Sequence, residues 1–346
     1  MKLRITHRWL TLPAIVLAAG SVFAGPPQAV WECGTVITEP GKYVLINDLA
    51  GCEEHGVLIY ASDVTLDLKG HTISCADNGE RLGGIVTALI DEEPWFIPVS
   101  NVEIRNGGVT GCADGVLLAA AQDSKILKIS SWENRVWDDP ETSDVESMSG
   151  TGITVWYSQN NVIMHNHAYG NEALGIGSWE SSGNLFKHNT SSFNGGGWYG
   201  SGIDLTGETN SRLLCNRIHG NVDGILMAPS TDSGVESKGN LLRGNLVTGN
   251  DFTGIGMMGF AWDGWYWLDI PAENTVRSNI VEGNGWFDFF ELYYDLYTGG
   301  LLPHPEDLCM NTWKKNQFGP AVFGPEGCFG APVVLDEDDV CALDDD

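Results

Sequence analysis

The chain has 346 residues, with 18 lysines and arginines against 46 aspartates and glutamates, and a formal net charge of −28 at pH 7. Binding to nucleic acid depends on a cationic surface, so this balance excludes nucleic acid as a partner. Outside the first 24 residues the chain has no run of some 18 apolar residues, so we expect no membrane span. We also expect a monomer.

Residues 1–24 have the composition of a secretion signal. Three basic residues precede an apolar run over residues 10–19, and small residues stand at the position where signal peptidase cleaves. We therefore expect cleavage near Ala24. The mature protein is then extracellular or periplasmic.

Residues 25–55 are a turn-rich segment that precedes a series of short apolar strands. Cys33 and Cys52 bracket its central turn, Thr38 to Tyr43. We interpret this segment as a cap on the N-terminal end of the domain.

Residues 56–330 repeat one short unit. It reads Asn-apolar-apolar-x-x-Asn-x-apolar-x-x-Asn, then a variable loop, then Gly and an apolar strand, and it is clearest from Asn161 to Asn171 with Gly175-Ile176. The opening glycines recur at Gly152, Gly175, Gly202, Gly224 and Gly254. This period is typical of solenoids, and the apolar segments are too short for helices. We predict about nine coils of three short strands each.

Two columns of asparagine follow from the repeat. The first is Asn166, Asn189, Asn216, Asn245, Asn279 and Asn316, and the second is Asn171, Asn194, Asn221, Asn250 and Asn284. Coils stacked in parallel about 4.8 Å apart would bring equivalent side chains into register. We therefore expect ladders of hydrogen-bonded amides inside the turns.

This pattern of asparagine and glycine resembles the right-handed parallel β-helix proteins of the pectate-lyase-like superfamily. The resemblance covers roughly Gly56 to Gly319 and implies an all-β, single-stranded right-handed parallel β-helix with Asn ladders. It leaves function open, because this fold carries lyases, hydrolases, epimerases and non-catalytic surface proteins.

Eight cysteines in a secreted chain indicate disulfides rather than a metal site. Two pairs bracket the ends of the repeat region, Cys33 with Cys52 and Cys309 with Cys328. Cys75 and Cys112 lie just past equivalent positions of neighbouring coils, which leaves Cys215 for Cys341. Residues 331–346 form an acidic tail that we expect to be disordered apart from Cys341.

The longest insertions flank the strand that begins with the repeat glycine, and they carry Trp198, Tyr199, Trp265 and Trp267. Alternation along that strand places Trp156 and Trp179 outward on adjacent coils, beside Gly177 and Asp204. Sugar rings pack on aromatic walls of this kind. We predict that these six aromatic residues bind a polysaccharide or cell-surface glycan.

A second group of residues lies just before the first Asn column, where Lys187, His165 and His188 belong to a strip of basic side chains with Arg105, Lys128, Arg243, Arg277, Lys314 and Lys315. The strip could engage anionic sugars, with Lys187 binding substrate. The alternative is that these cations only relieve the surrounding negative charge.

Three functions remain open. An inverting glycoside hydrolase needs two carboxyl groups ~6.5–9.5 Å apart. The register places Asp204 about 11 Å from Asp223, slightly beyond that range, and Glu180 about 6 Å from Glu208. A polyuronide lyase needs a base and a cation, for which His165, His188 and Lys187 are candidates. The third function is glycan binding without catalysis. None of these three functions requires a cofactor. Calcium is a possible ligand of the carboxylates, and the sequence leaves the metal ligands unknown.

Overall fold

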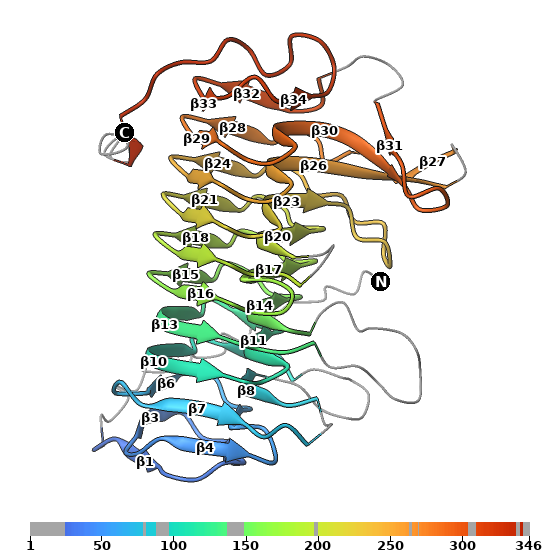
Figure 1. The fold of residues 1–346 in the computed structure, drawn as a ribbon. Coiled ribbons are helices and arrows are strands. Elements are labelled where there is room, and N and C mark those ends of the chain that lie inside the picture. Colours follow the sequence, from blue (N-terminus) through green and yellow to red (C-terminus); the bar gives the residue numbers. More distant parts are fainter. Residues whose placement is uncertain are drawn as a thin grey trace, which may run out of the picture.

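The structure is a computed structural model that describes residues 25–78, 81–87, 97–136, 149–196, 200–262, 265–268, 270–303, 309–336 and 340–341, without the side chains of 262 and 265–267. The chain winds into a right-handed parallel β-helix, as predicted (Figure 1). The expected signal segment lies outside the described residues. Within the described part, no helix is long and apolar enough to cross a membrane.

The strands line three faces. The first face contains β1 (Gln28–Val30), β3 (Gly41–Leu45), β6 (Val64–Asp67), the start of β10 (Glu103–Thr110), the start of β13 (Lys125–Trp132), β15 (Val162–Met164), β18 (Leu185–Lys187), β21 (Arg212–Leu214), β24 (Leu241–Arg243), β28 (Thr275–Arg277) and β32 (Thr312–Lys314). The second face contains β4 (Leu49–Cys52), β7 (Thr72–Cys75), the ends of β10 and β13, β16 (His167–Tyr169), β19 (Thr190–Ser192), β22 (Arg217–His219), β25 (Leu246–Thr248), β29 (Ile280–Glu282) and β33 (Gln317–Phe318).

Most strands of the third face begin at a glycine or next to one. It contains β2 (Thr35–Ile37), β5 (Val57–Ile59), β8 (Gly83–Thr87), β11 (Asp114–Ala119), β14 (Thr151–Trp156), β17 (Ile176–Trp179), β20 (Ser201–Thr206), β23 (Asp223–Ala228), β26 (Thr253–Trp262), β30 (Phe287–Asp295) and β34 (Val322–Phe323). β27 (Trp265–Leu268) and β31 (Leu301–Leu302) pair with β26 and β30 in antiparallel fashion, and β9 (Val99–Ser100) pairs with β12 (Ala121–Gln122).

The stack from β6 to β34 comprises nine coils, in agreement with the sequence pattern. At its N-terminal end β3 pairs with β6 and β4 pairs with β7. The segment 25–55 therefore adds strands of its own below the first predicted coil.

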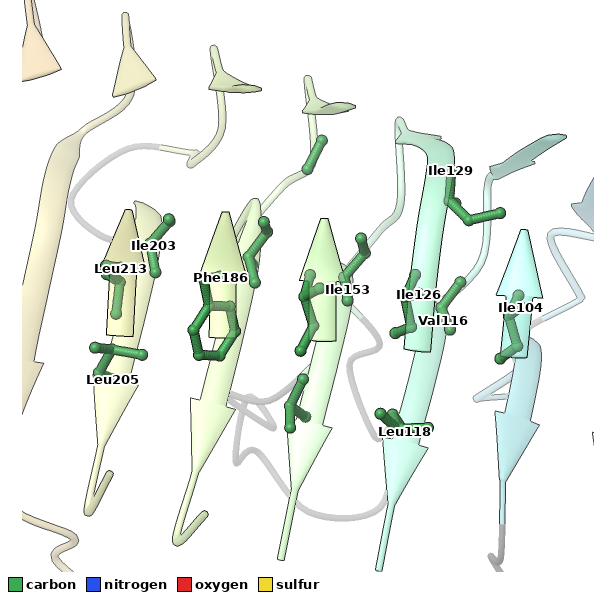
Figure 2. Close-up of a cluster of buried hydrophobic side chains, with 14 of the residues drawn as sticks. Ile104, Val116, Leu118, Ile126, Ile129, Ile153, Phe186, Ile203, Leu205 and Leu213 are labelled. Carbon is green, nitrogen blue, oxygen red and sulfur yellow. The ribbon is translucent and has the colours of Figure 1, made fainter. Parts of the chain in front are cut away.

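Apolar side chains fill the inside of the coils and repeat from one coil to the next (Figure 2). Ile104 lies beside Ile126 on the first face, and Val116 lies beside Ile153 on the third. Phe186 and Leu213 continue the first column and are fully buried. Burial of this kind contributes roughly 25 cal/mol per Å² of apolar surface, and each coil supplies part of the surface that covers its neighbours.

The asparagine ladders form as predicted. Asn216 donates from Nδ2 to Asn245 Oδ1 at 2.9 Å and to the carbonyl oxygen of Phe186 at 2.9 Å, and it is fully buried. The second column behaves in the same way from Asn171 to Asn284. A further ladder runs five residues ahead of the first, through Asn161, Asn184, Ser211, Asn240, Asn274 and Asn311.

Many of the residues that precede a ladder asparagine have positive φ, which turns the chain sharply between two strands. His165 (φ 59°), His188 (φ 54°) and Cys215 (φ 56°) hold this conformation without being glycine, whereas the next coil has Gly244 (φ 67°). Left-handed backbone costs an L residue about 1–2 kcal/mol, which the ladder contacts offset. The side chains of these residues therefore form a column of their own at one corner of the helix.

Three of the four predicted disulfides are present. Cys33 bonds to Cys52, Cys75 to Cys112 and Cys309 to Cys328. The fourth prediction was wrong for this structure, because Cys215 and Cys341 are not joined by a disulfide. Their sulfur atoms nevertheless lie within 4.8 Å of each other. The tail was expected to be disordered apart from Cys341, but the N–H groups of Val333 and Leu335 donate to Asn316 and Gln317, and Val340 is buried.

Candidate functional site

The predicted groove between Trp156 and Trp179 is not open. The two residues are in register on β14 and β17, as expected. Trp179, however, is only 7% exposed, and its indole lies across Gly177, where a Cβ on that glycine would come within 2.3 Å of the ring. The small residue that was expected to leave a gap is therefore covered by Trp179 itself, which packs with Ala173 and Leu174.

Trp156 faces a hollow on the N-terminal side of the predicted site. It is half-buried, stacks on Tyr157 with ring centroids 5.4 Å apart, and packs against Leu117 and Val86. The hollow has a volume of about 80 Å³ and is lined by His55, Arg81, Gly83, Val86, Asp114, Leu117 and Trp156. An aromatic wall with a few polar groups is the usual composition of a ligand pocket.

The polar groups of this pocket are fixed by hydrogen bonds. The buried carboxylate of Asp114 accepts a hydrogen bond from the Thr154 hydroxyl at 2.8 Å and lies 3.5 Å from a guanidinium nitrogen of Arg81. The backbone N–H of Gly83 donates to Nδ1 of His55 at 2.9 Å. Nδ1 of His55 is the acceptor of this hydrogen bond, so the neutral imidazole has its proton on Nε2. His55 and Arg81 therefore place donor groups at a pocket that also contains the Asp114 carboxylate, with which Arg81 forms an ion pair.

Asp204 and Asp223 form a pair of carboxyl groups on adjacent coils of the same face. Asp223 pairs with Ser201, so it stands three residues out of register with Asp204, as the sequence indicated. Burial raises the pKa of Asp204 to about 7, the Thr206 hydroxyl at 2.8 Å opposes that rise, and the charge of Asp223 adds to it.

Asp223 itself is half-buried at the edge of the face. Burial raises its pKa to about 6, against the effect of the Thr253 hydroxyl, which donates at 2.7 Å. The two groups thus change protonation near neutral pH, where a general acid and a general base are most effective.

The other carboxyl pair considered from the sequence does not form. Glu208 is fully buried and accepts hydrogen bonds from Ser178 at 2.6 Å, Asn184 at 3.0 Å and Ser211. Ser211 has no side-chain amide at its position in the third ladder, and the Glu208 carboxylate takes the place of that group. Burial raises the pKa of Glu208. Glu180 points elsewhere, since it accepts hydrogen bonds from the hydroxyls of Ser230 and Ser233. Glu208 is therefore structural.

His165, His188 and Lys187 lie at the first face, away from this pocket. The two imidazole rings stack at 5.1 Å with an interplanar angle of 10°. Lys187 ends β18 and pairs with Met164 and Leu214. The column that holds Lys187 also contains Leu127, so the basic strip is interrupted by apolar residues. Arg105, at its N-terminal end, is already paired with Asp67 and Glu103.

Trp198 and Tyr199 lie outside the described residues. Trp265 and Trp267 belong to β27, which pairs with β26, but their side chains are not described. These four predictions therefore remain predictions.

Sequence reasoning missed His55, Arg81 and Asp114. One signal was available: Asp114 stands directly before repeat glycine Gly115, as Asp223 stands before Gly224. Both aspartates begin a third-face strand, and each binds the hydroxyl of a threonine on the next coil. His55 and Arg81 come from irregular segments, so no period marks them.

The comparisons with known proteins agree with this fold. The family model described as "Right handed beta helix region" matches residues 95–261. No curated protein matches the chain by sequence. The chain has a right-handed parallel β-helix fold.

Solved structures extend the likeness over most of the chain. The periplasmic alginate epimerase AlgG aligns with a TM-score of 0.54 and 16% identity over 81% of this chain and 62% of that one. The Dettilon tailspike protein gp208 gives 0.56 and 14%, over 87% and 55% respectively. The A-module of the Azotobacter vinelandii mannuronan C-5 epimerase AlgE6 gives 0.46 and 15%, over 87% and 92%. This chain therefore spans only part of the length of AlgG and of the tailspike protein.

Proposed function

We propose that this is a secreted protein that acts on an extracellular polysaccharide at the third face, as a glycoside hydrolase. The observation that carries the proposal is the placement of the Asp204 and Asp223 carboxyl groups on adjacent coils of this face, where burial raises both pKa values toward neutral pH, to about 7 and about 6. Glycoside hydrolysis needs one carboxylic acid and one carboxylate. In this proposal Asp204 is the general acid and Asp223 the base.

The pocket at His55, Arg81 and Trp156 supplies the binding part of the proposal. It lies on the same face, with β14 and β17 between β11 and β20. At about 4.8 Å per coil that separation is roughly 14 Å, which a few sugar units of an extended chain could span. The indole of Trp156 suits the apolar face of a sugar ring, and Arg81, which is ion-paired with Asp114, adds a cation beside it.

Two features favour the second candidate function, glycan binding without catalysis. Asp204 is only 4% exposed, and Trp179 covers the neighbouring position. The lyase reading is the weakest of the three, because its candidate bases, His165 and His188, lie on another face. We propose no required cofactor, with calcium as an accessory ligand of the acidic surface.

The test is an assay of the mature protein against a panel of neutral and acidic polysaccharides. New reducing ends without ultraviolet-absorbing products indicate hydrolysis, and unsaturated products indicate a lyase. Asp223→Asn should abolish release of reducing ends while leaving binding intact. Binding of a polysaccharide with no product from the wild-type protein would establish the second candidate function instead.

A further inference from the structure

The corner column of left-handed residues contains a cluster that the proposed function does not use. His188 and Cys215 occupy equivalent positions on adjacent coils, each directly before a ladder asparagine. Cys215 is buried and His188 is exposed at the same corner, with His165 stacked on it from the preceding coil.

Gly244 makes room for the tail of the chain beside these residues. A Cβ at Gly244 would lie 2.9 Å from the carbonyl oxygen of Val340 and 3.4 Å from the sulfur of Cys215. Val340 is 4% exposed, and the Cys341 thiol approaches the carbonyl oxygen of Gly244 at 3.5 Å. The missing side chain thus lets Val340 and Cys341 dock against the corner.

This docking brings three metal-binding side chains together. One ring nitrogen of His188 and the sulfur atoms of Cys215 and Cys341 all lie within 4.8 Å of one another. Cys215 and Cys341 also line a small cavity of about 20 Å³ with Gly244 and Val340. A tetrahedral zinc ion has Zn–S bonds of about 2.3 Å and Zn–N bonds of about 2.0 Å, so its ligand atoms lie about 3.5–3.8 Å apart. Small side-chain movements would reach that geometry.

We propose that His188, Cys215 and Cys341 bind one zinc ion, which fastens the C-terminal tail to the β-helix. Two thiolates and an imidazole form a ligand set that selects zinc over calcium or magnesium. Three protein ligands leave the fourth position to water, and His165 lies next to His188 at the edge of the site. The thiols lose their protons on binding, so zinc affinity falls as the pH falls.

The test uses the full mature chain, secreted into zinc-containing medium. We expect about one zinc ion per chain by elemental analysis, and substitution by Co²⁺ should give the near-ultraviolet absorption of thiolate–cobalt bonds. Cys215→Ser should lose the metal, and His188→Gln should weaken binding by at least about tenfold. The matched control is His219→Gln, a histidine outside the cluster, which should bind zinc like the wild type.

Thiol counting on the denatured protein separates the alternatives. The proposal predicts two thiols per chain after removal of zinc with a chelator. It is overturned if non-reducing peptide mapping finds Cys215 joined to Cys341 in the secreted protein. Equal zinc content in the Cys215→Ser variant would also overturn it. His188→Gln changes an exposed side chain, so its result does not depend on refolding of a damaged core.

Discussion

Asn216 and Asn245 are joined on successive coils by a hydrogen bond of 2.9 Å between Nδ2 of the first and Oδ1 of the second. Asn216 Oδ1 in turn accepts from the backbone and side chain of Asn189. The side chain therefore satisfies polar groups on both neighbouring coils, in a place that water does not reach.

Replacing Asn216 with leucine should destabilise the fold. Each buried partner that loses its hydrogen bond costs about 1–3 kcal/mol, and Asn189, Asn245 and the carbonyl of Phe186 all lose one. Thermal and denaturant melts should show a clear loss of stability. Asn78→Leu, at an exposed asparagine, is the control and should change the midpoint little. An unchanged midpoint for Asn216→Leu would contradict the ladder.

The ladders show which parts of the fold could be predicted from the sequence. Asn166 and Asn171 recur at a fixed offset, and a period read along the chain becomes a column in space once coils stack. The repeat motif also contains the third ladder, beginning at Asn161. Ser211 interrupts this run of asparagines, and the Glu208 carboxylate that replaces the missing amide is held partly by a contact to another coil.

The candidate site could be predicted less well, for a physical reason. Alternation correctly placed Trp179 on the outer side of its strand, but the direction of its indole depends on side-chain rotation, and it folds over Gly177. Arg81 meets Asp114 across coils of unequal length. Contacts of this kind do not repeat along the sequence, so the pocket could be recognised only from the structure.

We expect the main contribution of Trp179 to be to the stability of the fold. Trp179→Ala removes a buried indole that packs on Ala173 and Leu174, which should cost about 3–5 kcal/mol. Denaturant titration measures this loss. Tyr157→Ala, at an exposed aromatic residue nearby, should cost much less. A fully stable Trp179→Ala variant with reduced glycan affinity would show instead that this residue belongs to the binding surface.

Stability should fall as the pH rises from about 4 to about 7, through the titration of Asp204. Its pKa is raised from 3.8 to about 7 in the folded protein, so the folded state binds more protons than the unfolded state in this window. The contribution is fully present below the unfolded pKa and is lost as the pH rises through the folded pKa.

Denaturant unfolding at several pH values measures this slope. Asp204→Asn should flatten it, because the amide does not titrate. Asp223 contributes over an overlapping window, with a pKa of about 6, so the double variant Asp204→Asn, Asp223→Asn should be flatter still. The same slope in wild type and double variant would mean that neither carboxyl has a raised pKa.

We expect an acidic polysaccharide to bind at the pocket that contains Arg81 and not at the basic strip. Arg81 is side by side with His55 and Trp156 in a walled pocket, where a bound carboxylate would be partly shielded from water. Arg243 and Arg277 lie in register on β24 and β28, on another face. A hydrogen bond to a charged group is worth about 1.5–3 kcal/mol, so Arg81→Ala should weaken binding about 10- to 100-fold.

The double variant Arg243→Ala, Arg277→Ala removes two cations from the surface and should weaken binding only slightly, in a manner that added salt abolishes. Isothermal titration with an acidic and a neutral polysaccharide measures both effects, and melting curves confirm that each variant is folded. Arg81→Lys tests whether charge alone suffices, because lysine lacks the planar pair of donors and should recover only part of the affinity. If the double variant loses binding and Arg81→Ala does not, the basic strip is the binding surface. In that case the lyase hypothesis moves ahead, with His165, His188 and Lys187 as its candidate residues.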